Sequence, residues 1–404
     1  MKVLLFSTLY PSEQRPIHGI FVETRLRELM NTGRVDARVV APVPWFPFKS
    51  DRFGEYAKFG ATARHEIRHG LEVHHPRYFL PPRIGMTLAP FSMALGALGT
   101  VHRLRREGFD FELIDAHYYY PDGVAAALLA RWFNTPLVVT ARGTDLNLMP
   151  QYAIPRRLIL NTAKLAGASI GVCQALMDQL HELGAEPGKL HTLRNGVDLK
   201  KFTPEPRGDA RRRLGLDAGK RYLLSVGHLI ERKGHFVAID ALALMAPDVC
   251  LLVVGEGPER AMLEAQAKRL GLGARVHFAG MVAQQDLKWW YSAADALTLC
   301  SSREGWANVL LESMACGTPV VATNIWGTPE VVSNPAAGVL MESRTPKALS
   351  QAWMKLVSAY PAREATRLHA ESFSWESTTE GQWTLFEELV HAHRASAGRS
   401  FPTS

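Results

Sequence analysis

Residues 301–323 read SSREGWANVLLESMACGTPVVAT, and this stretch says most about how the chain folds. It begins as a loop, continues with a helical pattern that starts near Ala307, and ends in the β-branched run Pro319–Ala322. A helix followed at once by a continuous apolar strand is typical of parallel sheets that carry helices on both faces.

The same alternation of apolar runs and helical patterns extends over the whole chain. In the first half the predicted strands are Val3–Ser7, Ala37–Ala41, Leu113–Ala116, Leu137–Thr140 and Ser169–Val172. In the second half they are Tyr222–Val226, Cys250–Val254, Val276–Phe278, Ala296–Leu299, Pro319–Ala322 and Gly338–Leu340. We therefore predict an α/β protein with two doubly wound, Rossmann-like domains that face each other across a cleft.

A segment rich in proline, glycine and charge, Phe202–Asp217, is the expected boundary between the domains. It gives an N-terminal domain of residues 1–202 and a C-terminal domain of residues 203–375. In residues 376–404 we expect a long helix that crosses back to the N-terminal domain and a frayed tail.

The composition restricts the partners and the compartment. The chain has 404 residues and a formal net charge of +7, which suits anionic partners. Its basic residues are dispersed and lack an aromatic stacking platform, so no nucleic-acid partner is expected. The four cysteines lie in apolar runs without a C-x-x-C motif, which predicts reduced core thiols in a cytoplasmic protein rather than disulfides or zinc.

Two segments bear on membranes. The N-terminal sequence MKVLLFSTLY predicts a first strand rather than a signal peptide. Residues 84–101 lack charge but contain Pro90 and three glycines, which favours a buried or membrane-contacting helix over a spanning one. Because Arg103, Arg105 and Arg106 follow, we expect peripheral contact with the anionic inner face of the cytoplasmic membrane.

The spacing of two carboxylates in the opening stretch suggests its chemistry. Glu304 follows a predicted strand, and Glu312 lies eight residues later within a helix. Eight helical residues rise about 12 Å, roughly the span of a sugar, a diphosphate and a ribose. The amides at the helix start can bind a diphosphate without a cation. Two solvated glutamates are the alternative, but the apolar neighbours of Glu312 argue against it.

These residues also resemble a known family. The pattern Glu304-x7-Glu312, followed by ACGTPVV at residues 315–321, is similar to that of the family 4 retaining glycosyltransferases with the GT-B fold, especially bacterial enzymes of the exopolysaccharide and teichuronic-acid type. Further similar segments are the inter-domain turn RNGVD (194–198), the phosphate loop VGHL (226–229) with Lys233–Gly234, and the nucleobase-flanking GEGP (255–258) and VHFAG (276–280).

The resemblance implies a function and assigns residues to it. The expected reaction moves a sugar from a UDP- or GDP-sugar to a hydroxyl of a glycan or lipid-linked acceptor, with no cofactor beyond this co-substrate. The implied donor residues are Gly19, His228, Arg232, Lys233, Glu304, Gly305, Trp306, Ala307, Asn308 and Glu312, with Gly255, Met281 and Val282 at the nucleobase. The implied catalytic set is Glu304, Lys233, His117 and Arg142, with His117, Arg142 and Asp145 on the acceptor side.

The chain departs from the family pattern at two positions. The family pairs its phosphate-binding lysine with an arginine, where this chain has His228; Arg232 is the residue placed to compensate. Many relatives have a histidine where this chain has Arg142, and an arginine can clamp an acceptor phosphate bidentately. His117 and Gly19 also have ordinary structural readings, as a lone buried histidine and as a turn glycine.

The sequence also bears on a metal requirement and on two alternative functions. No two aspartates stand two residues apart, so the metal-chelating D-x-D motif is absent and no metal requirement is expected. One alternative is a sugar-nucleotide epimerase or isomerase on a related two-domain fold. Another is a non-catalytic nucleotide-binding scaffold. The Glu-x7-Glu spacing favours the transferase.

Overall fold

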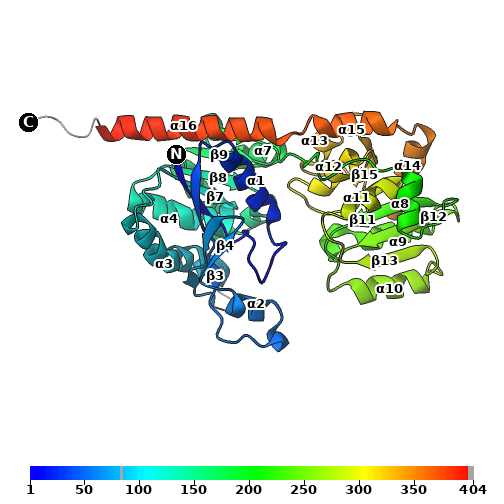
Figure 1. The fold of residues 1–404 in the computed structure, drawn as a ribbon, viewed down its shortest axis with the longest axis horizontal. Coiled ribbons are helices and arrows are strands. Elements are labelled where there is room, and N and C mark those ends of the chain that lie inside the picture. The colour runs from blue at the N-terminus through cyan, green and yellow to red at the C-terminus, as the bar shows by residue number, and fades with distance from the viewer. Residues whose placement is uncertain (82–84, 399–404) are drawn as a thin grey trace, which may run out of the picture. The chain divides into compact units, whose positions relative to one another are not determined.

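The computed structural model describes residues 1–81 and 85–398, and these residues form two compact units. The first unit comprises Met1–Leu193 with the residues from Glu376 onward, and the second comprises Arg194–Trp375. Each unit is a mostly parallel sheet flanked by helices (Figure 1), so the predicted pair of α/β domains is confirmed. The beginning of the apolar segment 84–101 and the expected frayed tail lie outside the described residues.

The sheet of the first unit has the strand order β10-β9-β8-β7-β1-β2-β5-β4. Its strands are β1 (Lys2–Phe6), β2 (Asp36–Val40), β4 (His65–Arg68), β5 (Leu71–His74), β7 (Leu113–His117), β8 (Leu137–Ala141), β9 (Ala168–Gly171) and β10 (Leu190–Thr192). The chain leaves β1 toward β2 on one side and later toward β7 on the other, so the topology reverses between β1 and β7. Ligands of open α/β sheets bind at such reversals, beyond the carboxyl ends of the strands.

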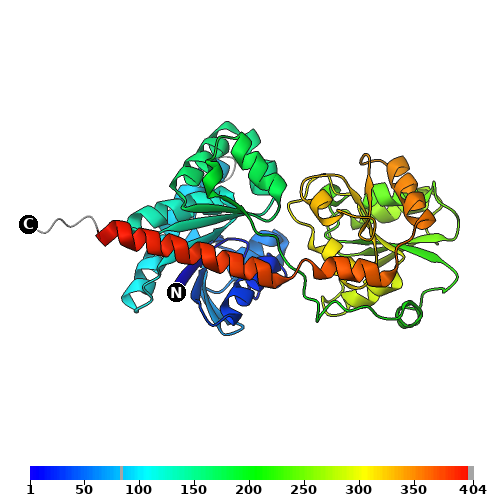
Figure 2. The same cartoon turned by 90° about the horizontal axis from the view of Figure 1, so that it is seen from above.

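Helices cover both faces of this first sheet. They are α1 (Ile20–Asn31), α2 (Glu55–Ala61), α3 (Gly85–Arg106), α4 (Val124–Phe133), α5 (Thr144–Asn147), α6 (Ala153–Leu165), α7 (Gln174–Glu182) and α16 (Trp375–Gly398). The long helix α16 runs across this unit (Figure 2) and buries Phe386 and Val390 against Leu5, Val138 and Ile170 of the strands. Apolar burial on this scale explains why the C-terminal residues belong to the first unit.

The second unit is a six-stranded parallel sheet with the order β13-β12-β11-β14-β15-β16. Its strands are β11 (Arg221–Val226), β12 (Val249–Val254), β13 (Val276–Gly280), β14 (Ala296–Leu299), β15 (Val320–Thr323) and β16 (Gly338–Met341). Its helices are α8 (Arg207–Arg213), α9 (His235–Leu242), α10 (Arg260–Arg269), α11 (Leu287–Ala293), α12 (Asn308–Ala315), α13 (Thr328–Val331), α14 (Pro346–Ser358) and α15 (Arg363–Glu371). Here the topology reverses between β11 and β14.

The change from one unit to the other comes earlier than the composition of the sequence suggests. We expected it after residue 202, whereas the contacts divide the chain between Leu193 and Arg194. The turn Arg194–Asp198 already packs on the second unit: the amide of Val197 donates to Phe373 O at 3.0 Å. A Cβ on Gly196 would lie 2.5 Å from the backbone nitrogen of Trp375, so only glycine fits there.

Several short strands were not predicted. They are β3 (Val43–Pro44), which pairs with β6 (Arg77–Tyr78), together with β4, β5 and β10. Strands β4 and β5 form an antiparallel hairpin whose turn residues His69 and Gly70 have φ of 49° and 80°. Such two-residue turns require positive φ at both positions. These strands have mixed polarity, so they lack the continuous apolar runs that predict buried strands.

Helix α3 corresponds to the uncharged segment 84–101. It buries Met93, Ala97 and Val101, while Phe91 and Leu95 stay exposed. Among the described helices, none combines the length and the hydropathy needed to cross a bilayer. The four cysteines are free and buried, as predicted.

Candidate active site

The reversal between β11 and β14 brings two loops of the second unit together. The loop after β11 contains Gly227, Lys233 and Gly234, and the loop after β14 contains Glu304. A Cβ on Gly234 would lie 2.0 Å from Cys300 O, and φ there is 72°, so glycine alone allows the loops to meet this closely. The aliphatic part of Lys233 lies along Gly227, 3.7 Å from where its Cβ would be.

An ion pair joins these loops. The Nζ of Lys233 donates to Glu304 Oε1 at 2.6 Å, and Ser301 Oγ donates to the same oxygen at 2.6 Å. Arg232 Nη1 lies 3.6 Å from it. Burial opposes ionisation of Glu304, but Lys233 and Arg232 outweigh it and hold the pKa of Glu304 below its usual value. The structure therefore places an ionised carboxylate and two cations at the carboxyl end of the sheet.

His228 is oriented by the backbone. Its Nδ1 lies 2.7 Å from the carbonyl oxygen of Glu256, which can only accept, so Nδ1 carries the proton. In the neutral ring the exposed Nε2 is then an acceptor. Only an imidazolium could therefore donate from Nε2 to a phosphate oxygen.

The start of α12 follows Glu304 directly. Ala307 is the N-cap and has no polar side chain, so no side chain caps the start of α12. The first amides of a helix that lacks such a cap can bind a phosphate. Trp306 is buried and donates from Nε1 to Asn195 O at 3.1 Å. Its indole N–H is thus engaged in anchoring the turn that enters this unit. The amides of Gly305 and Trp306 remain as candidate phosphate ligands.

Glu312 lies in the middle of α12 with a partner that the sequence did not reveal. The hydroxyl of Tyr291, on α11, donates to Glu312 Oε2 at 2.7 Å. Burial raises the pKa of Glu312, and the hydrogen bond from Tyr291 and the charge of Lys201 counteract it only in part. Tyr291 is fully buried, so its only polar atom fixes the carboxylate that we assign to the ribose.

The residues expected at the nucleobase lie on adjacent loops. The amide of Gly255 donates to Gly280 O at 2.8 Å, which brings the loops after β12 and β13 together. Met281 follows and is 68% exposed, and Val282 is half-buried. These positions fit an open, shallow nucleobase site.

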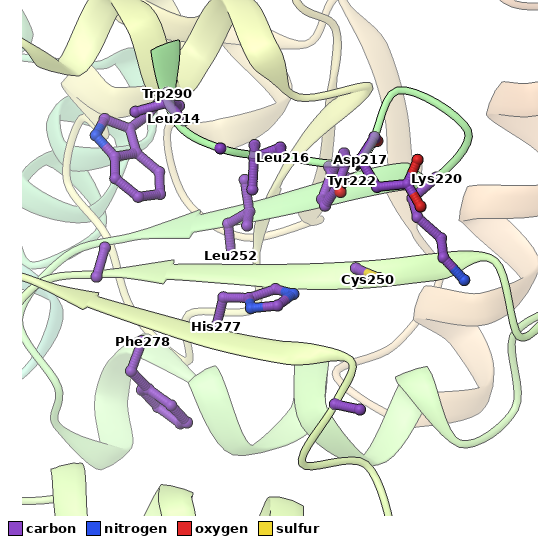
Figure 3. A pocket seen from close by; sticks show the side chains of 13 residues that line it. Leu214, Leu216, Asp217, Lys220, Tyr222, Cys250, Leu252, His277, Phe278 and Trp290 are labelled. Carbon is purple, nitrogen blue, oxygen red and sulfur yellow. Dashed lines mark hydrogen bonds between the residues drawn. The ribbon is translucent and has the colours of Figure 1, made fainter. Parts of the chain in front are cut away.

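A separate cavity of about 430 Å³ lies beside the sheet of the second unit (Figure 3). Tyr222, Cys250 and His277, the second residues of β11, β12 and β13, line it together with Trp290 of α11. It therefore opens toward the amino ends of the strands, away from the loops that bear Lys233 and Glu304. For this reason we do not assign it to the donor.

On the first unit, Gly19 is the N-cap of α1 with φ of 65°. A Cβ there would lie 1.4 Å from Leu9 O, in the loop after β1. Glycine is therefore required by the packing of this loop, whether or not its amide also meets a phosphate.

The acceptor-side residues form a buried chain. His117 Nε2 lies 3.1 Å from Asp115 Oδ2, and Arg142 Nη2 donates to His117 Nδ1. Burial lowers the pKa of His117 to about 4, although Asp115 opposes this. The imidazole is thus neutral, with Nε2–H directed at Asp115 and Nδ1 accepting from Arg142. Neither nitrogen is left to act as a base.

Asp145 is held by the backbone. Its carboxylate accepts from the amides of Tyr119, Arg142 and Gly143 at 2.7–3.2 Å. It ties the loop after β7 to the loop after β8, and burial raises its pKa. This arrangement explains the position of Arg142 and makes Asp145 a residue that shapes the site.

Comparisons with known proteins agree with this architecture. The family description "Glycosyltransferase Family 4" matches residues 26–201, and "Glycosyl transferases group 1" matches residues 206–372. A D-inositol 3-phosphate glycosyltransferase of Mycolicibacterium gilvum is 31% identical over 305 residues, which are 70% of this chain and 68% of that protein. The chain belongs to glycosyltransferase family 4.

Other family 4 relatives and solved structures extend the comparison. The putative teichuronic acid biosynthesis glycosyltransferase TuaC of Bacillus subtilis is 27% identical over 360 residues, 87% of this chain and 88% of that one. Sucrose-phosphate synthase from Thermosynechococcus elongatus superposes with a TM-score of 0.79 at 21% identity, covering 97% and 99% of the chains. Anabaena Alr3699/HepE in complex with UDP superposes with 0.73 at 22% identity, covering 96% and 100%. The GT-B fold expected from the sequence is confirmed.

Two further buried residues of this family 4 protein escaped the sequence analysis. Arg25, on α1, donates from Nε to Gln382 Oε1 at 2.7 Å, and Gln382 Nε2 donates to Asp115 Oδ2 at 3.1 Å. Gln382 lies on α16, more than 200 residues after the strand that it contacts. Only the fold brings these side chains together, and the helical pattern around Gln382 gave no sign of this contact.

The described residues contain one cluster with metal-ligand chemistry, His65, Glu72 and His74 on the hairpin β4–β5. Arg103 Nη2 lies 3.2 Å from His74 Nδ1, and Arg38 Nε lies 3.3 Å from Glu72. Two guanidinium groups at this distance oppose the binding of a cation. The cluster is also far along the sheet from β7 and lies at its edge, so we assign it no role in catalysis.

Proposed function

We propose that this protein transfers a glycosyl group from a nucleoside-diphosphate sugar to an acceptor hydroxyl, with retention of configuration and without a metal. The observation that supports this best is the pairing of Lys233 with Glu304 directly before the uncapped start of α12. The cation and the helix amides of this loop cluster suit a diphosphate, and the carboxylate suits the sugar hydroxyls.

In this proposal the diphosphate lies against the amides at the start of α12 and the ammonium group of Lys233. Lys233 then stabilises the negative charge that develops on the leaving diphosphate. Glu304, held ionised by its cationic partners, accepts hydrogen bonds from the sugar hydroxyls. Glu312, positioned by Tyr291, binds the ribose hydroxyls.

The chemical step needs no protein nucleophile. The bond between the anomeric carbon and the phosphate oxygen breaks, the acceptor oxygen bonds to the same face of that carbon, and the acceptor proton passes to the leaving phosphate. The engaged nitrogens of His117 favour this route over deprotonation by the imidazole. His117 then serves to hold Arg142 in place.

The donor base is proposed by analogy. Structures of HepE, which shares the fold, contain UDP and UDP-glucose, so a UDP-sugar is the first donor to examine, with GDP-sugars second. The similarity to TuaC, named for teichuronic acid biosynthesis, supports a lipid-linked glycan acceptor in bacterial surface or exopolysaccharide biosynthesis. We further propose that the protein works in the cytoplasm, on the inner face of the membrane.

The surface of α3 supports the membrane contact. Leu88, Phe91 and Leu95 are 42%, 41% and 64% exposed and lie at helical spacing on one face. The basic residues Arg103 and Arg106 follow at the end of the helix. An apolar face that continues into cationic side chains suits the boundary between acyl chains and anionic headgroups.

A thermal-shift panel with UDP-, GDP- and ADP-sugars tests the donor, because binding to the native state raises its melting temperature. Release of the nucleoside diphosphate is then measured with a membrane extract as acceptor, with and without EDTA. Activity lost to EDTA and restored by magnesium contradicts metal independence. A changed sugar on an intact diphosphate indicates an epimerase, and binding without any turnover indicates a scaffold.

A further inference from the structure

A cavity of about 300 Å³ lies in the first unit beside the loop that follows β1. Its walls include the side chains Arg15, His18, Tyr56, Phe59 and Tyr78. Thr8 and Ala41, which come just after β1 and β2, also line it. It thus opens at the carboxyl ends of the strands, where open α/β sheets bind ligands.

The contacts of Arg15 suit the binding of an anion in this cavity. Its guanidinium carbon lies 5.1 Å from the centroid of the Phe59 ring, and Nη2 lies 3.0 Å from His18 Nδ1. Its carboxylate partner is Glu55, whose Oε2 is 3.5 Å from Nε and whose side chain is 58% exposed. A guanidinium that is held in orientation on one side and paired with an exchangeable surface carboxylate on the other can accept a phosphate in its place.

Arg142, the other candidate for the acceptor phosphate, is placed differently. It is buried, donates to His117 and lies 5.2 Å from the centroid of Phe21. Its guanidinium is therefore part of the wall of the unit. Arg15 is the better partner for an anion that enters from solvent.

Aromatic rings lead from the cavity to the surface. Phe59, Tyr56, Phe46 and Phe48 follow one another with centroid distances of 6.0, 5.3 and 5.9 Å. We call these four rings the aromatic ridge. Tyr56 and Phe48 are 56% and 52% exposed, and the segment also carries Lys49, Arg52 and Lys58. Exposed aromatic rings interleaved with basic side chains suit an amphipathic ligand at a membrane surface.

We propose that this cavity and the aromatic ridge bind the lipid-phosphate part of the acceptor, with the phosphate on Arg15 and the apolar chain along the ridge. The proposal rests on the function proposed above and adds the site at which the lipid phosphate of the acceptor binds. A carboxylate on a soluble glycan could also pair with Arg15, but it would leave the ridge without an apolar partner. The combination of one half-buried cation and an exposed apolar path favours the lipid phosphate.

The test measures binding of farnesyl phosphate to the full chain by calorimetry without donor. Arg15→Gln should weaken binding about tenfold or more, because a charge-assisted hydrogen bond is lost. Glu55→Gln should strengthen it, because the competing carboxylate is removed. These opposite signs separate the proposal from a folding defect. Arg27→Gln, an exposed charge on α1, is the matched control and should leave binding unchanged.

One further variant and two further ligands show whether the bound anion is a lipid phosphate or the carboxylate of a soluble glycan. Phe48→Ser should weaken farnesyl phosphate binding, and farnesol should bind the wild-type protein more weakly than farnesyl phosphate. Equal binding by the Arg15→Gln and Arg27→Gln proteins overturns the proposal, as does Arg15-dependent binding of p-nitrophenyl glucuronide without binding of farnesyl phosphate.

Donor hydrolysis is followed on the same proteins. Absence of donor hydrolysis in the wild type counts against the proposed transferase. Binding of farnesyl phosphate tests only the cavity and the aromatic ridge, so the two proposals can fail separately.

Discussion

The phenol hydroxyl of Tyr291 donates a 2.7 Å hydrogen bond to Oε2 of Glu312, and both atoms lie on helices that pack against each other in the second unit. Tyr291 is fully buried and Glu312 is partly exposed, so the bond holds the carboxylate from its buried side. In the proposed function, a carboxylate held in this way is pre-organised for the two hydroxyls of the ribose.

Tyr291→Phe should therefore raise the donor KM about fivefold, the cost of one hydrogen bond, while kcat changes little. In the proposed reaction the ribose is bound alike in the ground state and in the transition state, so the effect should fall on KM. Tyr222→Phe is the control, since that hydroxyl donates to Asp217 O near the amino end of β11. Equal KM values for the two variants would contradict the role given to Tyr291.

The Lys233–Glu304 pair predicts a separation of stability from activity. Lys233→Met should lower kcat about 10²–10³-fold by removing the cation from the leaving group. It also leaves a buried carboxylate without its closest cation and should destabilise the second unit by about 3 kcal/mol. The double variant Lys233→Met/Glu304→Gln should recover most of the stability and none of the activity.

Urea unfolding and donor turnover are both measured on these proteins, with Lys200→Met, an exposed lysine, as the control. A double variant that regains activity would show that Lys233 serves only to neutralise Glu304.

Buried histidines predict how stability depends on pH. Burial lowers the pKa of His18, His74, His117 and His235 to about 4 from an ordinary value of 6.5. Between these values the unfolded chain binds protons that the folded protein does not, so stability is lost as the pH falls from about 6.5 to about 4. Each histidine contributes about 1.4 kcal/mol per pH unit to the slope.

His235 offers the simplest test, because both of its hydrogen-bond partners are uncharged. They are the hydroxyl of Ser225 and the carbonyl of His228. His235→Asn should reduce the slope of unfolding free energy against pH by one proton's contribution, measured by urea titration across the window. An unchanged slope would mean that His235 does not resist protonation in the folded protein.

Much of the geometry of the proposed donor site could be predicted because its residues are close in sequence. Glu304, Ala307 and Glu312 fall within one loop and one helix, so their order and spacing follow from helical geometry. Lys233 was also correctly placed after a strand, but its ion pair with Glu304 joins loops about 70 residues apart. That contact depends on the reversal of strand order between β11 and β14, which apolar patterns do not encode.

The geometry of the proposed acceptor site was harder to predict, because its contacts join residues that are far apart in sequence. His117 and Arg142 were identified at strand ends, yet their states are set by Asp115, Arg25 and Gln382. Asp115 lies inside an apolar strand and Gln382 on the last helix, so no local pattern joins them. The imidazole of His117 is neutral because it is buried, and both of its nitrogens are hydrogen-bonded. Burial depends on the packing of the whole unit.

Gly19 has a matched partner that separates packing from backbone strain. Gly19 and Gly33 have φ of 65° and 73°, but a Cβ would clash with Leu9 O at Gly19 and meet nothing within 4 Å at Gly33. Gly33→Ala should cost about 1 kcal/mol, the strain of a left-handed alanine. Gly19→Ala should cost about 3 kcal/mol or more, because the loop after β1 must move as well. Equal losses in urea unfolding would show that this loop yields without cost.

The exposed face of α3 predicts membrane binding that can be removed without disturbing the fold. Phe91→Ser/Leu95→Ser should weaken binding to phosphatidylglycerol-containing vesicles about 10²-fold or more, since each buried apolar side chain contributes about 1.5–3 kcal/mol. Ile154→Ser/Leu165→Ser is the matched control, because both side chains are similarly exposed on α6. Neutral phosphatidylcholine vesicles should bind the wild type more weakly, because Arg103 and Arg106 each contribute about 1 kcal/mol toward anionic headgroups. If the α6 pair reduced vesicle binding as much as the α3 pair, the contact would be general apolar adhesion rather than docking through α3.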